Sequence, residues 1–183
     1  MHTVVLVEGL SDQLALETLA ARRGRDLGAE GVAVVPMGGA TNIGRFLGLY
    51  GPDGSDLQLA GLYDAAEEHI LRRGLERANL GSRLTRAGME ALGFHVCVAD
   101  LEDELIRAVG PATVEHVLDQ HGDLASFRIF QQQPAQRGKD VQALLRRFMG
   151  TRSGRKFEYA RSLVAAMDLA RTPRALDGVL AHV

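Results

Sequence analysis

The stretch VVLVEGLSD, residues 4–12, is the clearest indication of the fold in this chain. Its first four residues are aliphatic and three of them are β-branched, which predicts a strand buried on both faces, as in the middle of a parallel sheet. Glu8 follows this run directly, so its carboxylate must lie where the strand ends. In open α/β sheets ligands bind at that edge, because the loops there converge on one crevice. Glu8 is therefore the first candidate site residue.

The composition is that of one compact globular domain. The chain has 183 residues, of which 46% are hydrophobic and 24% are charged, enough to bury a sizeable core. Its single cysteine, Cys97, excludes an internal disulfide framework and a cysteine zinc cluster, and it indicates a reducing compartment. The sequence shows neither a signal peptide nor an apolar stretch near the ~20 residues of a membrane helix. We therefore expect a soluble cytoplasmic protein without membrane contact.

Apolar runs and amphipathic stretches alternate in the first half of the chain, which is typical of βαβ units. The predicted strands cover residues 3–7, 31–35, 57–63 and 93–98, and Ser11 is the expected N-cap of the first helix. Beyond them the pattern favours helices at 102–109, 112–120, 124–131, 140–149 and 158–169. We predict an α/β core over residues 1–110 and a helical C-terminal extension over residues 111–183 that packs on it.

Acidic side chains follow three of the four predicted strands. They are Glu8 and Asp12 after the first, Asp64 and Glu67 after the third, and Asp100, Glu102, Asp103 and Glu104 after the fourth. Carboxylates gathered at one sheet edge repel each other unless a cation neutralises them or some stay protonated. An all-oxygen set, with no cysteine cluster and no suitable histidine pair, favours Mg²⁺ or Mn²⁺ over zinc.

Several of these candidates have a simpler explanation. Asp12 lies in the first turn of a predicted helix, where the helix dipole favours a carboxylate, and the same holds for Asp103 and Glu104. Gly38 and Gly39 belong to a strand-to-helix loop whose amides could bind a phosphate, although the glycines also suit a tight turn. Both explanations stay open at the level of sequence.

The net charge of −2 hides a division along the chain. Residues 1–127 hold 10 basic and 19 acidic residues, whereas residues 128–161 hold 9 basic and 2 acidic ones. This basic segment can attract phosphate, although solvated helix faces of opposite sign would explain the same pattern. Lys156 begins a predicted helix, where the dipole disfavours a cation, and this indicates an anionic partner. Four arginines in this segment are expected to attract nucleic acid through their positive charge, namely Arg146, Arg147, Arg152 and Arg155.

The motifs VEGLSD, VVPMGGATNI, GLYDAAEE, DLEDEL and GRK, in this order, resemble the TOPRIM domain of topoisomerases, primases and nucleases. More narrowly, they resemble the TOPRIM portion of the OLD (overcoming lysogenization defect) nucleases in a form without the ATPase. The resemblance covers most of the chain and implies a Rossmann-like TOPRIM fold with about four parallel strands flanked by helices. It also implies Mg²⁺- or Mn²⁺-dependent phosphodiester cleavage, with Glu8 as metal ligand or general acid/base, Asp12 and Asp64 as metal ligands, and Lys156 as catalytic lysine.

One departure from the family concerns the metal site. The family has Asp-x-Asp where this chain has Asp64 followed by two alanines, so Ala66 replaces the second aspartate. Glu67 would have to reach the same ion, and Glu102 or Glu104 would complete a second metal shell. We predict a Mg²⁺-dependent nuclease acting on nucleic acid, with DNA as the expected substrate. The alternatives are a catalytically degenerate binding module and a small TOPRIM ribonuclease, and a separate ATPase partner or a homodimer is compatible with each.

Overall fold

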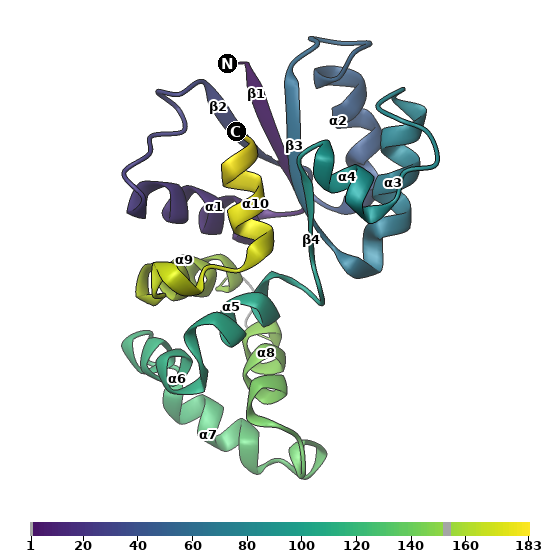
Figure 1. Ribbon diagram of the computed structural model, residues 1–183. Coiled ribbons are helices and arrows are strands. Elements are labelled where there is room, and N and C mark those ends of the chain that lie inside the picture. Colours follow the sequence, from purple (N-terminus) through teal and green to yellow (C-terminus); the bar gives the residue numbers. More distant parts are fainter. Residues whose placement is uncertain (1, 152–154) are drawn as a thin grey trace.

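The computed structural model describes residues 2–151 and 155–183 and contains a four-stranded parallel sheet (Figure 1). The strands are β1 (Thr3–Val7), β2 (Val32–Pro36), β3 (Gln58–Asp64) and β4 (Phe94–Cys97), in the spatial order β2-β1-β3-β4. Val5 of β1 is in register with Val34 of β2 and with Ala60 of β3. The predicted α/β class and the parallel sheet are confirmed.

The apolar run of β1 divides between two hydrophobic clusters, one on each face of the sheet. Val5 and Val7 belong to the first cluster, and Val4 and Leu6 belong to the second. This alternation follows from the two-residue period of a strand. All four side chains are buried, and Glu8, the residue directly after β1, is a charged residue that is only partly buried.

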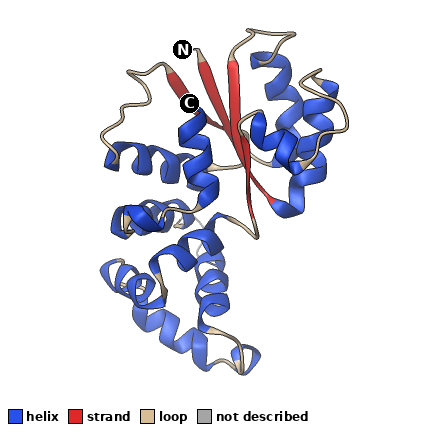
Figure 2. Cartoon of the chain, viewed as in Figure 1, coloured by secondary structure: helices blue, strands red, loops and turns tan. Residues whose placement is uncertain are grey.

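Helices cover both faces of the sheet (Figure 2). On one face lie α2 (Ile43–Tyr50), α3 (Glu68–Arg77) and α4 (Arg86–Ala91). On the other lie α1 (Leu10–Arg22) and α10 (Arg174–His182), while α9 (Lys156–Ala166) packs along α1. Short 3-10 turns precede α2 and α3, namely η1 (Ala40–Asn42) and η2 (Ala65–Glu67).

Four further helices extend beyond the end of β4 (Figure 1). They are α5 (Leu101–Val109), α6 (Pro111–Gln120), α7 (Leu124–Gln132) and α8 (Val141–Thr151), with 3-10 turns η3 (Pro134–Gln136) and η4 (Leu169–Arg171) in this half of the chain. One hydrophobic cluster runs without a break from β1 into α5–α10, so the sheet and the extension share a core. A boundary at residue 110 remains a prediction. No described helix is long and apolar enough to cross a membrane.

The sequence patterns did not predict α4 or α10. Pro173 precedes α10 without a side-chain cap, and Gly178 lies inside it, so local propensity is weak. Tertiary packing explains the helix, because α10 contacts β3 and β4. A Cβ atom at Gly178 would lie only 2.3 Å from His95 Nδ1, so glycine allows this close approach.

The N-terminus of α1 also differs from the prediction. The helix begins at Leu10 with Gly9 as its N-cap, so Ser11 is already a helical residue. The Asp12 carboxylate takes the capping role, because its Oδ2 atom accepts a hydrogen bond from the Gly9 amide at 2.9 Å. An aspartate at the third helical position binds a backbone amide that has no partner within the helix, and its negative charge interacts favourably with the helix dipole.

Candidate active site

The loop after β2 holds the main chain of Glu8. The Glu8 carbonyl oxygen accepts hydrogen bonds from the amides of Gly38 at 2.9 Å and Gly39 at 3.1 Å. Both glycines have positive φ, 72° and 121°, which other residues rarely adopt. Their amides are therefore already used, and the predicted phosphate-loop role of Gly38 and Gly39 is not supported by this arrangement. The tight turn explains them, and its effect is to position Glu8 at the sheet edge.

Asp12 faces the same edge from the first turn of α1. Burial raises the pKa of Asp12 to about 6, against the opposing effect of the hydrogen bond from Gly9. The negative charges of Glu102 and Glu8 raise the pKa of Asp12 further. Asp12 is thus both a helix cap and a member of an acidic cluster with Glu8, the residue after β1, and Glu102 of α5.

Asp64 ends β3, the strand beside β1. Burial is the main cause that raises the pKa of Asp64 to about 8, and the charges of Asp12, Glu8 and Asp100 add to it. A carboxyl group with this pKa is largely protonated at neutral pH unless a cation compensates the surrounding charge. Acids that follow separate strands are thus near enough to act on one another's charge at this edge, and their joint role as a site stays a prediction.

Glu67 lies in η2, directly after Ala66. Burial raises the pKa of Glu67 to about 7, helped by a hydrogen bond with the Glu8 carboxyl group and by the charges of Glu8 and Asp12. Glu67 Oε2 is buried and has no hydrogen-bond donor among the described residues. Because both groups are acceptors when ionised, a contact between Glu67 and Glu8 requires a shared proton or a cation.

The acids after β4 separate into different roles. Asp100 caps α5 by accepting from the Asp103 amide at 2.8 Å, and its other oxygen lies 2.7 Å from a terminal nitrogen of Arg146. Glu104 accepts from the Val98 amide at 2.9 Å and forms an ion pair with Arg107, also at 2.9 Å. The Glu104 carboxylate therefore holds the turn between β4 and α5. Among the two acids predicted to complete a second metal shell, Glu102 is the one whose charge reaches Asp12.

Lys156 lies across from Glu102. It is the first residue of α9, as predicted, and its Nζ atom is 3.5 Å from Glu102 Oε1. The Glu102 side chain is only 10% exposed, whereas that of Lys156 is 50% exposed, so the ammonium group remains accessible. A pocket of about 260 Å³ lies here, and Arg146 and Arg147 also line it. The geometry thus places positive charge from α8 and α9 beside the acids.

The other arginines of the basic segment behave differently. Arg155 forms an ion pair of 2.5 Å with Asp123, whose side chain is 6% exposed, and Tyr159 donates a hydrogen bond to the same carboxylate. Arg155 therefore anchors the start of α9, which the sequence pattern did not indicate because Asp123 is 32 residues away. Arg152, the remaining arginine predicted to bind nucleic acid, lies outside the described residues.

The chemistry of this site suits a divalent cation. The donors are all carboxylates, the pKa values of three of them are raised, and one buried oxygen, Glu67 Oε2, has no donor among the described residues. Hard oxygen ligands of this kind are typical of Mg²⁺ and Mn²⁺ sites. Within residues 2–151 and 155–183, however, no group of three or more potential ligands is already arranged around one point. The donor types fit a metal, and the side chains would have to close around it.

Comparisons with known proteins agree with this fold. Residues 1–64 match a sequence model described as "Overcoming lysogenization defect protein-like, TOPRIM domain". The C-terminal region of the Burkholderia pseudomallei OLD protein has a similar structure, with a TM-score of 0.75 and 19% identity over 99% of this chain and 96% of that one. The C-terminal region of the Xanthomonas campestris pv. campestris OLD protein gives 0.75 and 22% over 100% and 91%. No curated protein sequence matches significantly.

Proposed function

Because this chain carries an OLD-like TOPRIM domain, a metal-binding module of the nucleotidyl-hydrolase type, we propose that it is a Mg²⁺- or Mn²⁺-dependent nuclease, with DNA as the expected substrate. The observation that carries the proposal is the convergence of carboxylates from α1, β3, η2 and the residue after β1, because burial and neighbouring negative charge raise the pKa values of Asp12, Asp64 and Glu67 there. Such an arrangement costs stability in the folded protein, and a bound cation would remove the cost.

We assign the metal to Glu8, Asp12 and Asp64, with Glu67 in place of the aspartate that Ala66 replaces and Glu102 as a further ligand. A divalent ion held there would supply polarisation of the scissile phosphate and a lower pKa for an attacking water. Glu67, whose pKa is raised to about 7, would have to lose its proton to act as a ligand, because carboxyl groups bind metal ions as carboxylates. Glu104 is omitted from this set because the turn after β4 already uses both of its oxygens.

The residues outside the acidic cluster orient the substrate. Lys156 is placed to stabilise negative charge on the phosphate as it develops, and the contact with Glu102 keeps its ammonium group at the site. Arg147, exposed beside the same pocket, would bind a neighbouring phosphate. Arg146 is neutralised in part by Asp100, so its contribution to nucleic-acid binding should be smaller.

The test is a cleavage assay on supercoiled plasmid, linear duplex DNA and single-stranded RNA in Mg²⁺, Mn²⁺, Ca²⁺ or EDTA. Glu8→Gln and Asp64→Asn should each abolish metal-dependent cleavage, whereas Asp119→Asn, an exposed acid on α6, should leave it unchanged. Parental rates in both site variants would refute the assignment. The preferred substrate would decide between the DNA nuclease and the ribonuclease alternative.

The degenerate binding module remains the second candidate, and Ala66 is the observation that favours it. Salt-sensitive binding of nucleic acid without turnover in any metal would support it. Restoring the family pattern with Ala66→Asp would then be informative, since activity gained by this single change would identify the missing ligand. We also propose that the protein works with a separate ATPase or as a homodimer. Cleavage assays with an added ATPase would test the first, and measurement of the molecular mass in solution would test the second.

A further inference from the structure

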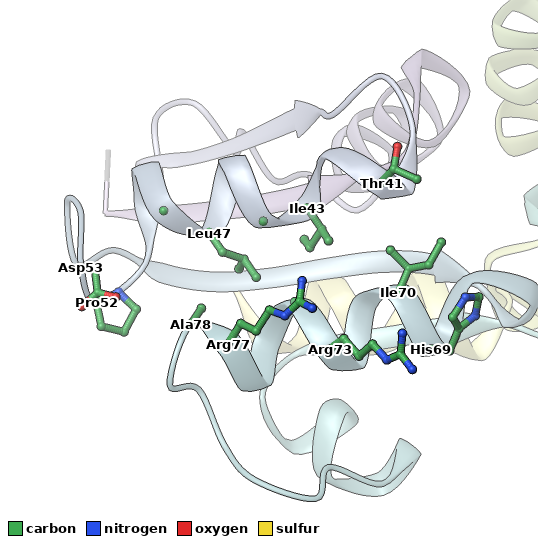
Figure 3. A pocket seen from close by; sticks show the side chains of 13 residues that line it. Thr41, Ile43, Leu47, Pro52, Asp53, His69, Ile70, Arg73, Arg77 and Ala78 are labelled. Carbon is green, nitrogen blue, oxygen red and sulfur yellow. The ribbon is translucent and has the colours of Figure 1, made fainter.

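A second cavity lies between α2 and α3, away from the acidic cluster (Figure 3). Its volume is about 470 Å³, within the usual range for small-molecule sites. Ile43 and Leu47 of α2 and Ile70 of α3 form an apolar floor between the two helices. Gly74 explains why the helices approach closely here, because a Cβ atom at this position would lie 2.9 Å from Ile43 Cγ2.

Two arginines of α3 bring positive charge to the cavity. Arg73 and Arg77 extend along it from successive turns of α3, and both are exposed (Figure 3). Neither forms an ion pair with any residue that the structure describes. On the neighbouring helix the situation is different, since Arg86 pairs with Glu68 at 2.5 Å. Two free guanidinium groups on one wall favour an anionic ligand, and most directly a phosphate.

The wall formed by α2 lacks side chains at two glycines. Gly44 and Gly48 are one turn apart on α2 and line the cavity, and a Cβ atom at either position would meet nothing within 4 Å. Glycine inside a helix costs up to about 1 kcal/mol relative to alanine, and neither position requires glycine for its backbone conformation. The two residues leave main chain exposed and open space beside the apolar floor, so a planar ring has room to lie there.

The two ends of the cavity differ in polarity. Pro52 and Asp53 lie at one end, whereas Thr41 and His69 lie at the other (Figure 3). A phosphate is therefore favoured near Arg73 and the His69 end and disfavoured near the Asp53 carboxylate. The carboxylate suits a hydroxyl donor instead, because an ionised aspartate only accepts hydrogen bonds.

From these features we propose that the cavity between α2 and α3 binds a nucleoside 5′-phosphate. The base lies on the apolar floor against Gly44 and Gly48, the phosphate is held by Arg73 and Arg77, and a sugar hydroxyl donates to Asp53. The same chemistry is offered by a free nucleotide and by the 5′-phosphorylated end of a nucleic acid strand. The site does not involve the acidic cluster, so its ligand binds without a metal.

The test is calorimetric titration in EDTA with adenosine 5′-monophosphate, adenosine and ribose 5-phosphate. The nucleotide should bind more tightly than either fragment. The double variant Arg73→Gln/Arg77→Gln should weaken nucleotide binding at least about tenfold, because each guanidinium contributes a charged hydrogen bond. Arg45→Gln is the matched control, since Arg45 is an exposed arginine of α2 that does not line the cavity.

A second variant separates loss of the site from loss of the fold. Gly48→Leu should fill the cavity and abolish binding without lowering the melting temperature, because the position is open and leucine favours helix. Competition by a short 5′-phosphorylated oligonucleotide would identify a strand end as the natural ligand, and its absence would identify a free nucleotide. No binding by the parent at millimolar nucleotide, or equal binding by the parent and both cavity variants, would overturn the proposal. EDTA makes these outcomes independent of the nuclease assignment.

Discussion

Replacing Asp64 with asparagine should stabilise the metal-free protein at pH 8. Asparagine keeps the size and shape of the side chain but carries no charge. In the folded protein, burial and the charges of Asp12 and Glu8 raise the pKa of Asp64 to about 8, whereas an unfolded chain has a value near 3.9. The folded state therefore holds a proton that the unfolded state has lost between about pH 4 and pH 8.

The sign of the effect follows from this proton balance. The free energy of unfolding of the parent should fall as the pH rises through that window, and the loss should be complete above the folded pKa. Asp12, with a pKa of about 6, and Glu67, with a pKa of about 7, act in the same direction. Each pKa unit corresponds to about 1.4 kcal/mol, but Asp64 is only partly buried and water screens its neighbours. We therefore expect Asp64→Asn to gain about 1–3 kcal/mol at pH 8.

The assay is chemical denaturation in EDTA at pH 5 and pH 8, on the parent, Asp64→Asn and the exposed control Asp119→Asn. The gain of Asp64→Asn over the parent should be larger at pH 8 than at pH 5, and the control should show none. Adding Mg²⁺ at pH 8 should stabilise the parent more than the variant. If Asp64→Asn were no more stable than the parent at pH 8, the electrostatic strain assigned to this cluster would be wrong.

Three further variants test the packing around the site. Gly178→Ala should destabilise the protein by about 1–3 kcal/mol in thermal or chemical unfolding, because the added methyl group would collide with His95; unchanged stability would mean that α10 can move away from β4. Asp123→Ala should lower stability by about 1–3 kcal/mol, because it removes a buried carboxylate and leaves the buried Tyr159 hydroxyl without this acceptor. It should also slow cleavage by loosening the start of α9, and parental cleavage would remove the positioning role. Glu104→Gln should retain metal-dependent cleavage, and its complete loss would restore this residue to the ligand set.

The strands were predictable because their signal is local. Buried parallel strands need uninterrupted apolar runs, and the predicted 3–7, 31–35, 57–63 and 93–98 differ from the observed strands by no more than one residue at either end. The helix α10 was not predicted, because a nine-residue segment that contains glycine has little helix propensity of its own. Its stability comes from contact with β3 and β4.

The acidic cluster was partly predictable for a similar reason. Topology brings the ends of parallel strands to one edge, so the positions of Glu8 and Asp64 in the sequence were enough to expect them together. The different roles of Glu102 and Glu104 were not predictable, because they depend on which of the two carboxylates binds the Val98 amide and Arg107. Those partners are set by the turn into α5.

Short-range patterns of apolar and charged residues were enough to predict the sheet, the edge at which acids gather and the helix that begins at Lys156. Three features became visible only in the folded chain: Gly38 and Gly39 bind the Glu8 carbonyl, Arg155 pairs with Asp123, and α2 and α3 leave a cavity between them. These outcomes depend on which groups compete for the same hydrogen bond, charge or space. The competing residues are distant from one another in the chain, so a local sequence pattern does not indicate which contact forms.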